Sequence, residues 1–254
     1  VTNRNDWSLS PNRLDLDIST VISMLSPQQT SVILQYQTEL SQEVRLESEE
    51  QAELAWVLGA FYADSEIKGD ATRSFGLIER TQYTLKSKSI ALFSSIGKNL
   101  SENDYLSLGL RYDKFDKQMK RDKTNSMFGS SPQVNGSNDF SSFSPSIKWE
   151  HSFSDELTGN ARITYAEKPG GFSAYADNAA DSVFIEEETL AYEVSILFSP
   201  SDSWGVNLTA YLNDIKNYQF ELPDPNPSSR MDTDYFVANA DEVTAKGIEI
   251  EGFL

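Results

Sequence analysis

The sequence offers few side chains that could do chemistry. It contains one histidine, His151, and no cysteine, so thiol catalysis, disulfides and cysteine-based metal sites are excluded. A Ser-His-Asp triad would have to use His151, and no neighbouring motif supports one. His151 shares its parity with Ile147 and Trp149 in a strand-like run that lies close to a turn. We therefore expect an interfacial histidine and not a catalytic one.

Carboxylates and glycines do not form a recognisable site either. Glu186-Glu187-Glu188 and Glu47 to Glu50 are expected to be solvated loop charge. Pro223 to Pro227 contains too many prolines to wrap around a calcium ion. Pro169-Gly170-Gly171 lacks the Lys-Ser/Thr pair and the helix of a phosphate loop, so it predicts a turn where the chain leaves a sheet. The sequence thus predicts no enzyme, no catalytic, cofactor-binding or metal site, and no cofactor.

The elements that would position side chains are strands, and Trp204 to Asn213 is the clearest of them. Its even positions are apolar, and its odd positions are small or polar except for Tyr211. Successive strand side chains point to opposite faces, so one face is apolar and the other polar. About ten residues is the length that a tilted strand needs to cross a bilayer. A soluble sheet could show the same alternation.

The same alternation recurs in the runs Leu157 to Tyr165 and Leu190 to Phe198. Arg162 and Glu193 place charges in the middle of these runs, on the face opposite the apolar side chains. Such charges are tolerable only where that face meets water, as the lumen of a large barrel does.

Strand-like runs continue over the whole chain from Ser41, and we expect about nine strands. The short connections lie near residues 50, 101, 155 and 201, and the long ones near 70, 127, 178 and 227. Among the long loops we expect Glu66 to Ser74 and Lys114 to about Phe140. Short turns at one end and long loops at the other are typical of outer-membrane barrels, whereas a β-sandwich should show less regular loop lengths.

The sequence resembles those of the TonB-dependent outer-membrane receptors. Tyr165 to Phe172, with Pro169-Gly170-Gly171, looks like a strand-to-loop motif of that family. Further segments resemble the family in the same order along the chain: Ser41 to Ser48, Leu108 to Tyr112, Thr189 to Ile196, Asn207 to Tyr218 and Ala245 to Glu251. The resemblance covers most of the chain but only the middle of such a receptor, because no plug domain, energy-coupling box or terminal strand is visible.

The resemblance implies an all-β fold, an antiparallel transmembrane β-barrel. Residues 1–40 would form a variable loop or irregular segment, and residues 41–254 a partial barrel domain. Ile248, Ile250 and Leu254 still alternate where the sequence stops, so we expect an incomplete, open, curved sheet whose first and last strands do not meet.

The resemblance also implies a receptor in the outer membrane of a Gram-negative bacterium, in contact with its lipid. It would take up a scarce small-molecule nutrient, a ferric siderophore first and cobalamin or an oligosaccharide next, through TonB acting on a plug domain outside this chain. The lumen-lining candidates are Arg111, Lys148, Glu150, Arg162 and Glu193.

The net charge of the chain indicates which further classes of partner are to be expected. With 21 basic and 39 acidic residues the net charge is −18, which argues against nucleic acid, because phosphate contacts need a basic surface. Two alternatives stay open: a passive porin-like barrel of the same membrane, and a soluble ligand-binding β-sandwich.

Overall fold

A computed structural model describes residues 2–8, 12–16, 29–49, 52–74, 78–126, 129–130, 133–176, 182–201, 203–223 and 235–254. Every regular element in these ranges is a β-strand. Within these ranges there is no helix with the length and apolar character needed to cross a membrane.

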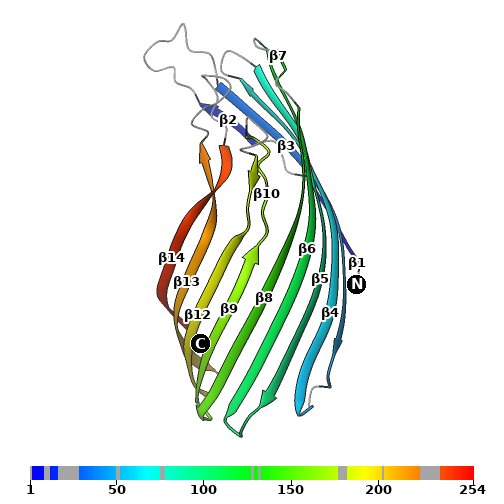
Figure 1. The fold of residues 1–254 in the computed structure, drawn as a ribbon. Helices are drawn as coiled ribbons and strands as arrows, with labels where there is room; N and C mark the ends of the chain where they lie inside the picture. The colour runs from blue at the N-terminus through cyan, green and yellow to red at the C-terminus, as the bar shows by residue number, and fades with distance from the viewer. Residues whose placement is uncertain are drawn as a thin grey trace.

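Nine long strands form the body of the structure (Figure 1). They are β3 (Gln29–Glu47), β4 (Leu54–Ser74), β5 (Ile78–Asn99), β6 (Asp104–Asn125), β8 (Val134–Ser154), β9 (Leu157–Lys168), β12 (Glu187–Ser201), β13 (Trp204–Pro223) and β14 (Tyr235–Phe253). The short strands are β1 (Thr2–Ser8), β2 (Asn12–Leu16), β7 (Gly129–Ser130), β10 (Gly171–Phe172) and β11 (Val183–Phe184). The number of long strands agrees with the prediction of about nine.

The long strands make one antiparallel sheet in which each strand pairs with the next long strand along the chain. The sheet has the order β1-β3-β4-β5-β6-β8-β9-β12-β13-β14, with β2 and β7 added beside β3 and β6. It curves strongly, as Figure 1 shows, and in the described ranges its edge strands β1 and β14 do not pair with each other. The expected all-β, antiparallel, open and curved sheet is therefore confirmed.

All four predicted short connections are present, and they lie together at one end of the sheet (Figure 1). They span residues 48–53, 100–103, 155–156 and 202–203. Ser101 shapes one of these turns, because its hydroxyl donates to the Asp104 carboxylate over 2.6 Å and accepts from the Asp104 amide over 3.1 Å.

Two predicted long loops are wrong. The range Glu66 to Ser74 is the part of β4 that lies away from the short turns, and most of Lys114 to Phe140 belongs to β6 and β8. In these parts the even positions of β4 and β6 are polar, and the odd positions mix apolar residues such as Ile67 and Met119 with basic ones such as Lys117. The apolar–polar contrast that reveals a strand in a sequence is therefore weaker, and the apolar side chains lie on the opposite face from those nearer the short turns. The β5–β6 ladder nevertheless continues without a break as far as the pair Glu79–Asn125. Strands also occur in residues 1–40, where an irregular segment was expected.

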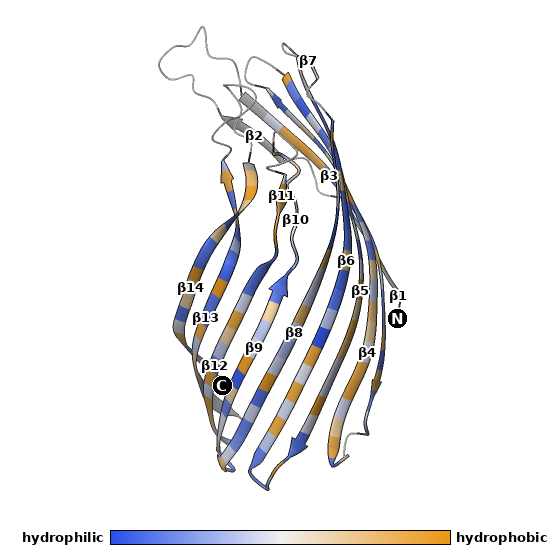
Figure 2. Ribbon diagram, viewed as in Figure 1, coloured by the Kyte–Doolittle hydropathy of each residue, from blue (hydrophilic) through white to orange (hydrophobic). Residues whose placement is uncertain are grey.

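The register gives the sheet two chemically different faces. The outer face is defined here as the face that carries Leu58, Leu92, Ile147, Ile196 and Leu208, all of which are exposed. Rows of paired residues keep such side chains together: Ile196 pairs with Leu208, and Leu208 with Ile250. Figure 2 shows the resulting apolar bands on the strands in the half of the sheet nearest the short turns.

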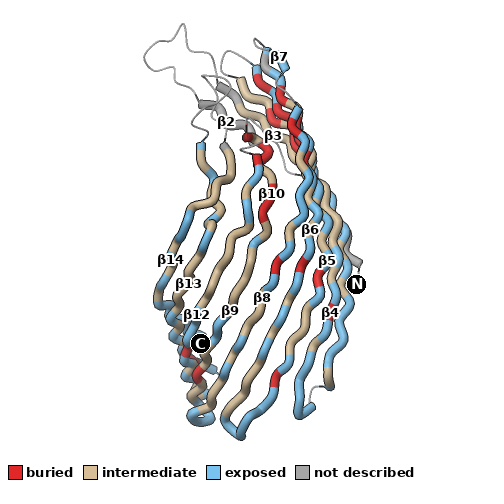
Figure 3. The backbone as a smooth tube through the Cα atoms, in the orientation of Figure 1, coloured by how far each residue is buried: buried red, intermediate tan, exposed pale blue. Residues whose placement is uncertain are grey.

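The opposite face, called the inner face, holds most of the buried residues. They gather on β4, β5 and β6 at the ends of these strands that lie away from the short turns, and on the segment that contains β10 and β11 (Figure 3). Met119, Val134, Ala174 and Ala176 are buried there. The predicted turn at Pro169-Gly170-Gly171 is confirmed, because β9 ends at Lys168 and the chain leaves the large sheet to form the β10–β11 hairpin.

Candidate functional site: the inner face of the sheet

The structure places all five sequence-predicted residues on the inner face. Lys148 pairs with Arg162 across β8 and β9, and Arg162 pairs with Glu193 across β9 and β12. These three side chains therefore form one row across three strands. Glu150 lies one step along the same face of β8, and its carboxylate accepts a hydrogen bond of 2.9 Å from Lys148 Nζ. Arg111 lies on the same face but further from the short turns than this row, since it pairs with Ser144 of β8.

Arg162 and Glu193 line an open hollow of about 520 Å³ on this face. Thr209, Tyr211 and Asn213 supply hydroxyl and amide groups to the same hollow. Neither Arg162 nor Glu193 forms an ion pair with any residue that the structure describes. Both charges remain available to a solute, which is what a water-facing wall requires.

Arg111 is held in a fixed position by an acidic neighbour and two rings. Its guanidinium makes a two-pronged hydrogen bond to buried Asp113, with distances of 2.8 Å and 2.7 Å. It also lies 5.8 Å from the ring centre of Phe61 and 5.7 Å from that of Phe93. Such cation–π contacts orient the charge without neutralising it.

Gly59 makes this arrangement possible. A Cβ at position 59 would lie 2.0 Å from the nearest ring atom of Phe93. The ring therefore lies flat over the backbone of the neighbouring strand, which is a close approach that glycine alone allows.

The β10–β11 hairpin is tied to the inner face by Lys117. The Lys117 ammonium donates a 2.7 Å hydrogen bond to the carbonyl of Gly170 and lies 5.6 Å from the ring centres of Phe115 and Phe140. Burial first, and the nearby charge of Lys168 second, lower the pKa of Lys117 to about 8.

The other side of the hairpin segment is tied to β13 and β14. The Gln219 amide donates to the carbonyl oxygens of Ile185 and Pro169 over 2.9 Å and 3.2 Å. Asn239 bonds to both backbone groups of Ile185, at 3.0 Å and 3.1 Å. The described residues of this segment, 169–176 and 182–185, therefore contact β6 on one side and β13 and β14 on the other.

The sequence did not reveal these contacts. Lys117 and Phe140 fell in a range that was taken for a loop, and the bond between Lys117 and Gly170 joins residues 53 positions apart. The one usable signal was parity, because Lys117 continues the odd-numbered series of Arg111 and Asp113 along β6.

His151 lies on the outer face beside the turn at residues 100–103, as expected. Its Nδ1 is 2.8 Å from Asp104 Oδ1, and its ring packs edge-on against Phe153 at a centroid distance of 4.6 Å. In the described part of the chain no serine hydroxyl bonds to the histidine ring, since Ser101 bonds to Asp104 instead. The described residues also contain no group of three His, Cys, Asp or Glu that could hold a metal ion.

Long antiparallel strands, an apolar outer face and a polar inner face define this structure as part of the wall of a large membrane-type β-barrel. The chain belongs to the TonB-dependent receptor family: residues 2–254 match the family model described as "TonB dependent receptor-like, beta-barrel". This family consists of transport receptors of the Gram-negative outer membrane, not of enzymes.

Three solved receptors have a similar fold. The ferric yersiniabactin uptake receptor FyuA from Yersinia pestis has a TM-score of 0.74 at 14% identity, over 88% of this chain and 33% of that one. BauA, the ferric preacinetobactin receptor from Acinetobacter baumannii, has a TM-score of 0.54 at 14% identity, over 99% of this chain and 38% of that one. The Serratia marcescens hemophore receptor HasR has a TM-score of 0.51 at 12% identity, over 99% of this chain and 51% of that one. The chain thus spans about a third to a half of the length of these receptors.

Proposed function

We propose that this chain forms a section of the barrel wall of an outer-membrane receptor that imports a scarce nutrient, with a ferric siderophore as the favoured cargo. The observation that carries the proposal is the inner face. It combines the exposed charges of Arg162 and Glu193 with a hairpin segment that is folded against the wall by Lys117. A protein with a sealed core would not keep such charges on that face.

The cargo is proposed from the similar receptors. FyuA is described as a receptor for the uptake of ferric yersiniabactin, BauA as the receptor for ferric preacinetobactin, and HasR as a hemophore receptor in complex with its hemophore and heme. An iron chelate is the class that these three have in common. The five inner-face residues Arg111, Lys148, Glu150, Arg162 and Glu193 are proposed to line the passage, and energy is proposed to come from TonB through a plug domain.

Uptake by the full-length receptor tests this proposal. Cells that carry the receptor as their one route for a given ferric siderophore should accumulate the radiolabelled iron, and deletion of TonB should abolish the accumulation. The double variant Arg162→Gln with Glu193→Gln should slow uptake while the receptor still reaches the membrane. Uptake that continues without TonB would instead indicate a passive pore and would contradict the proposal.

A further inference from the structure

The strand pairing of the sheet is interrupted between β8 and β13, at the end away from the short turns (Figure 1). β9 and β12 lie between these two strands and stop at Lys168 and Glu187, whereas β8 and β13 continue beyond them. β8 therefore pairs with β6 from Val134 but with β9 only from Ser146. In the part of the chain that the structure describes, residues 134–145 thus have a paired strand on one side only. This interruption is called the pairing gap.

Two features end the ladder between β8 and β9. The register would next pair Tyr165 with Pro145, which has no amide hydrogen to donate. Beyond it, the amide of Phe143 donates to Glu167 Oε2 over 2.9 Å and not to a backbone carbonyl. The other carboxylate oxygen of Glu167 accepts from the Tyr165 hydroxyl over 2.8 Å. A side-chain acceptor thus occupies the first free amide of β8 in the pairing gap.

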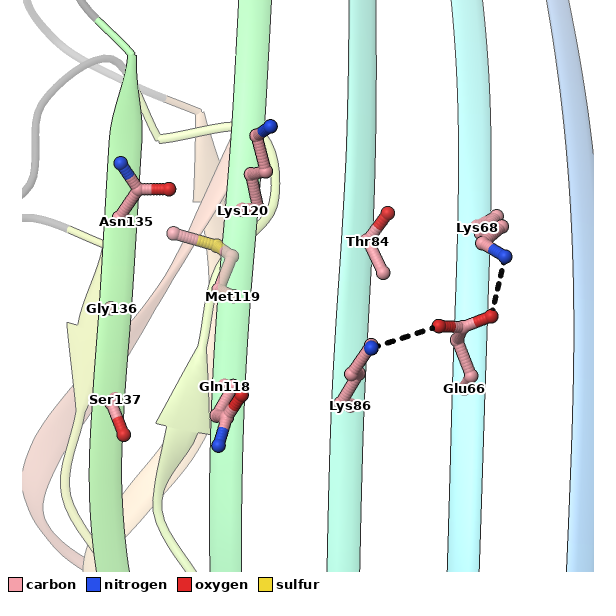
Figure 4. Close-up of a pocket in the computed structure, with 10 residues that line it drawn as sticks. All are labelled: Glu66, Lys68, Thr84, Lys86, Gln118, Met119, Lys120, Asn135, Gly136 and Ser137. Atoms are coloured by element: carbon pink, nitrogen blue, oxygen red, sulfur yellow. Dashed lines mark ion pairs between the residues drawn. The ribbon is translucent and has the colours of Figure 1, made fainter.

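The rest of this edge of β8 is open, and residues 135–141 are called the β8 edge. Backbone groups of successive residues point to opposite sides of a strand, so the odd-numbered residues point into the pairing gap as Phe143 does. These residues are Asn135, Ser137, Asp139 and Ser141. Among the described residues no backbone group bonds to them on that side. Figure 4 shows two of them, Asn135 and Ser137, on the strand beside Gln118 of β6.

The opposite edge of the pairing gap, on β13, is better protected. The amide of Gln219 donates to Glu187 Oε2 over 2.7 Å, and Pro223 has no amide hydrogen. The β8 edge contains neither proline nor lysine, the residues that commonly block pairing at an edge. The hairpin covers this edge only from the inner side, where the ring of Phe172 lies against the backbone of Gly136. The β8 edge is therefore the side that can accept another strand.

The borders of the pairing gap are acidic. They carry six acidic side chains and one basic side chain, namely Asp139, Glu167, Glu186 to Glu188 and Glu221 against Lys168. The adjoining residues 114–121, 216 and 235–241 add five basic and two acidic side chains, which leaves a balance of −2. A basic segment is therefore favoured over an acidic one at this place.

We propose that the β8 edge binds an extended, basic segment of a protein partner as an added β-strand. Main-chain hydrogen bonds supply the affinity in this mode of recognition, and alternate side chains supply the specificity. The β8 edge offers roughly 20 Å of strand at about 3.4 Å per residue. Two strands are missing beside it, so one added strand has room. Binding of a polypeptide here goes beyond the proposed transport and does not depend on it.

Binding of short peptides to the full-length receptor in nanodiscs tests the proposal. The basic probe is Lys-Val-Lys-Thr-Lys-Val-Lys, and its acidic counterpart has Glu in place of Lys. The basic probe should bind saturably, and the acidic one at least about tenfold more weakly. N-methylation of one alternate set of amides in the basic probe should weaken binding by about tenfold or more, whereas methylation of the other set should change it less than about twofold. Binding should slow hydrogen exchange at the amides of Ser137 and Ser141 but not at that of Asn138, which faces β6.

Two receptor variants separate the backbone from the side chain. Ser137→Pro removes an amide that points into the pairing gap but leaves the ladder to β6, so the basic probe should bind about tenfold more weakly. Ser137→Ala keeps the amide and is the matched control, with binding within about twofold of the parent. Iron uptake should be unchanged in both variants, which separates a failure here from a failure of the transport proposal.

Four results would each overturn the proposal. The basic probe could show no saturable binding at about 1 mM, or both sets of N-methyl groups could act equally. The amides of Ser137 and Ser141 could be protected before any peptide is added, which would mean that the receptor covers its own edge. Protection that rises with receptor concentration would indicate a second copy of the chain as the occupant.

Discussion

At the scale of single residues, the two faces of β13 give the sharpest contrast. Leu208 is 44% exposed on the outer face, whereas its neighbour Asn207 lies on the inner face and donates to Thr209 over 3.2 Å. We expect Leu208→Arg to destabilise the folded receptor in a bilayer by roughly 2–4 kcal/mol near the midplane. Asn207→Arg should cost much less, because its side chain reaches water.

Reversible unfolding of both variants from lipid vesicles by guanidinium measures this difference. A larger loss of free energy for Asn207→Arg than for Leu208→Arg would reverse the assignment of the two faces.

Lys117 provides a prediction about pH. Phe115 and Phe140 of the sheet and Gly170 of the hairpin segment bury this amine, so docking of the segment contributes to the lowering of the pKa from the ordinary 10.5 to about 8. Between about pH 8 and 10.5 the docked state therefore binds fewer protons than the undocked state. By linkage, docking strengthens as the pH rises through this window and is weakest below pH 8.

An NMR titration of the full-length receptor with ¹³C-methylated lysines checks the value. One resonance should have its midpoint near pH 8, and that resonance should be missing from Lys117→Gln. A spectrum in which every lysine titrates near 10.5 would contradict the buried position of this amine.

At the scale of elements, the hairpin segment depends on close packing at Gly170. A Cβ at this position would lie 2.4 Å from a ring atom of Phe140 and 2.5 Å from the carbonyl oxygen of Phe184. Gly170→Ala should therefore loosen the hairpin from the inner face while the large sheet stays intact. Gly252→Ala is the matched control, because its nearest contact would be an ordinary 3.6 Å.

Hydrogen exchange at the Ser173 amide measures the effect, because this amide donates to Ser182 across the hairpin over 2.6 Å. This amide should exchange faster in Gly170→Ala, and its exchange rate should be unchanged in Gly252→Ala. Equal protection in both variants would show that the hairpin does not depend on this contact.

The strands also show how far the sequence could predict this structure. Around Leu208 and Ile196 one face is apolar and the other polar, so a period of two identified these strands and assigned their faces correctly. Around Lys68 and Lys120 the outer face becomes polar, and Ile67, Ala71 and Met119 lie on the inner face instead. The apolar series of the outer face therefore stops, and these parts of the strands were taken for loops. The contact of Lys117 with Gly170 could not be predicted, because it depends on how a distant turn folds back onto the sheet.

At the scale of the whole molecule, the account makes one central claim: the outer face of the sheet meets lipid, and the inner face meets water. The five residues predicted to line the lumen were assigned to the inner face from parity alone, and the register of the sheet agrees. The role of the inner face as a passage wall, the nutrient and the dependence on TonB are proposals that rest on this division.

Cysteine labelling along β13 tests the division most directly, because the chain has no cysteine of its own. Single cysteines at positions 206 to 210 of the full-length receptor are treated in intact outer membranes with a water-soluble maleimide. Each is also labelled with a fluorophore whose quenching by brominated lipid is measured. The account predicts that positions 207 and 209 react with the maleimide, and that probes at 206, 208 and 210 are quenched by the lipid. Quenching at 207 and 209 together with free maleimide reaction at 206, 208 and 210 would contradict it.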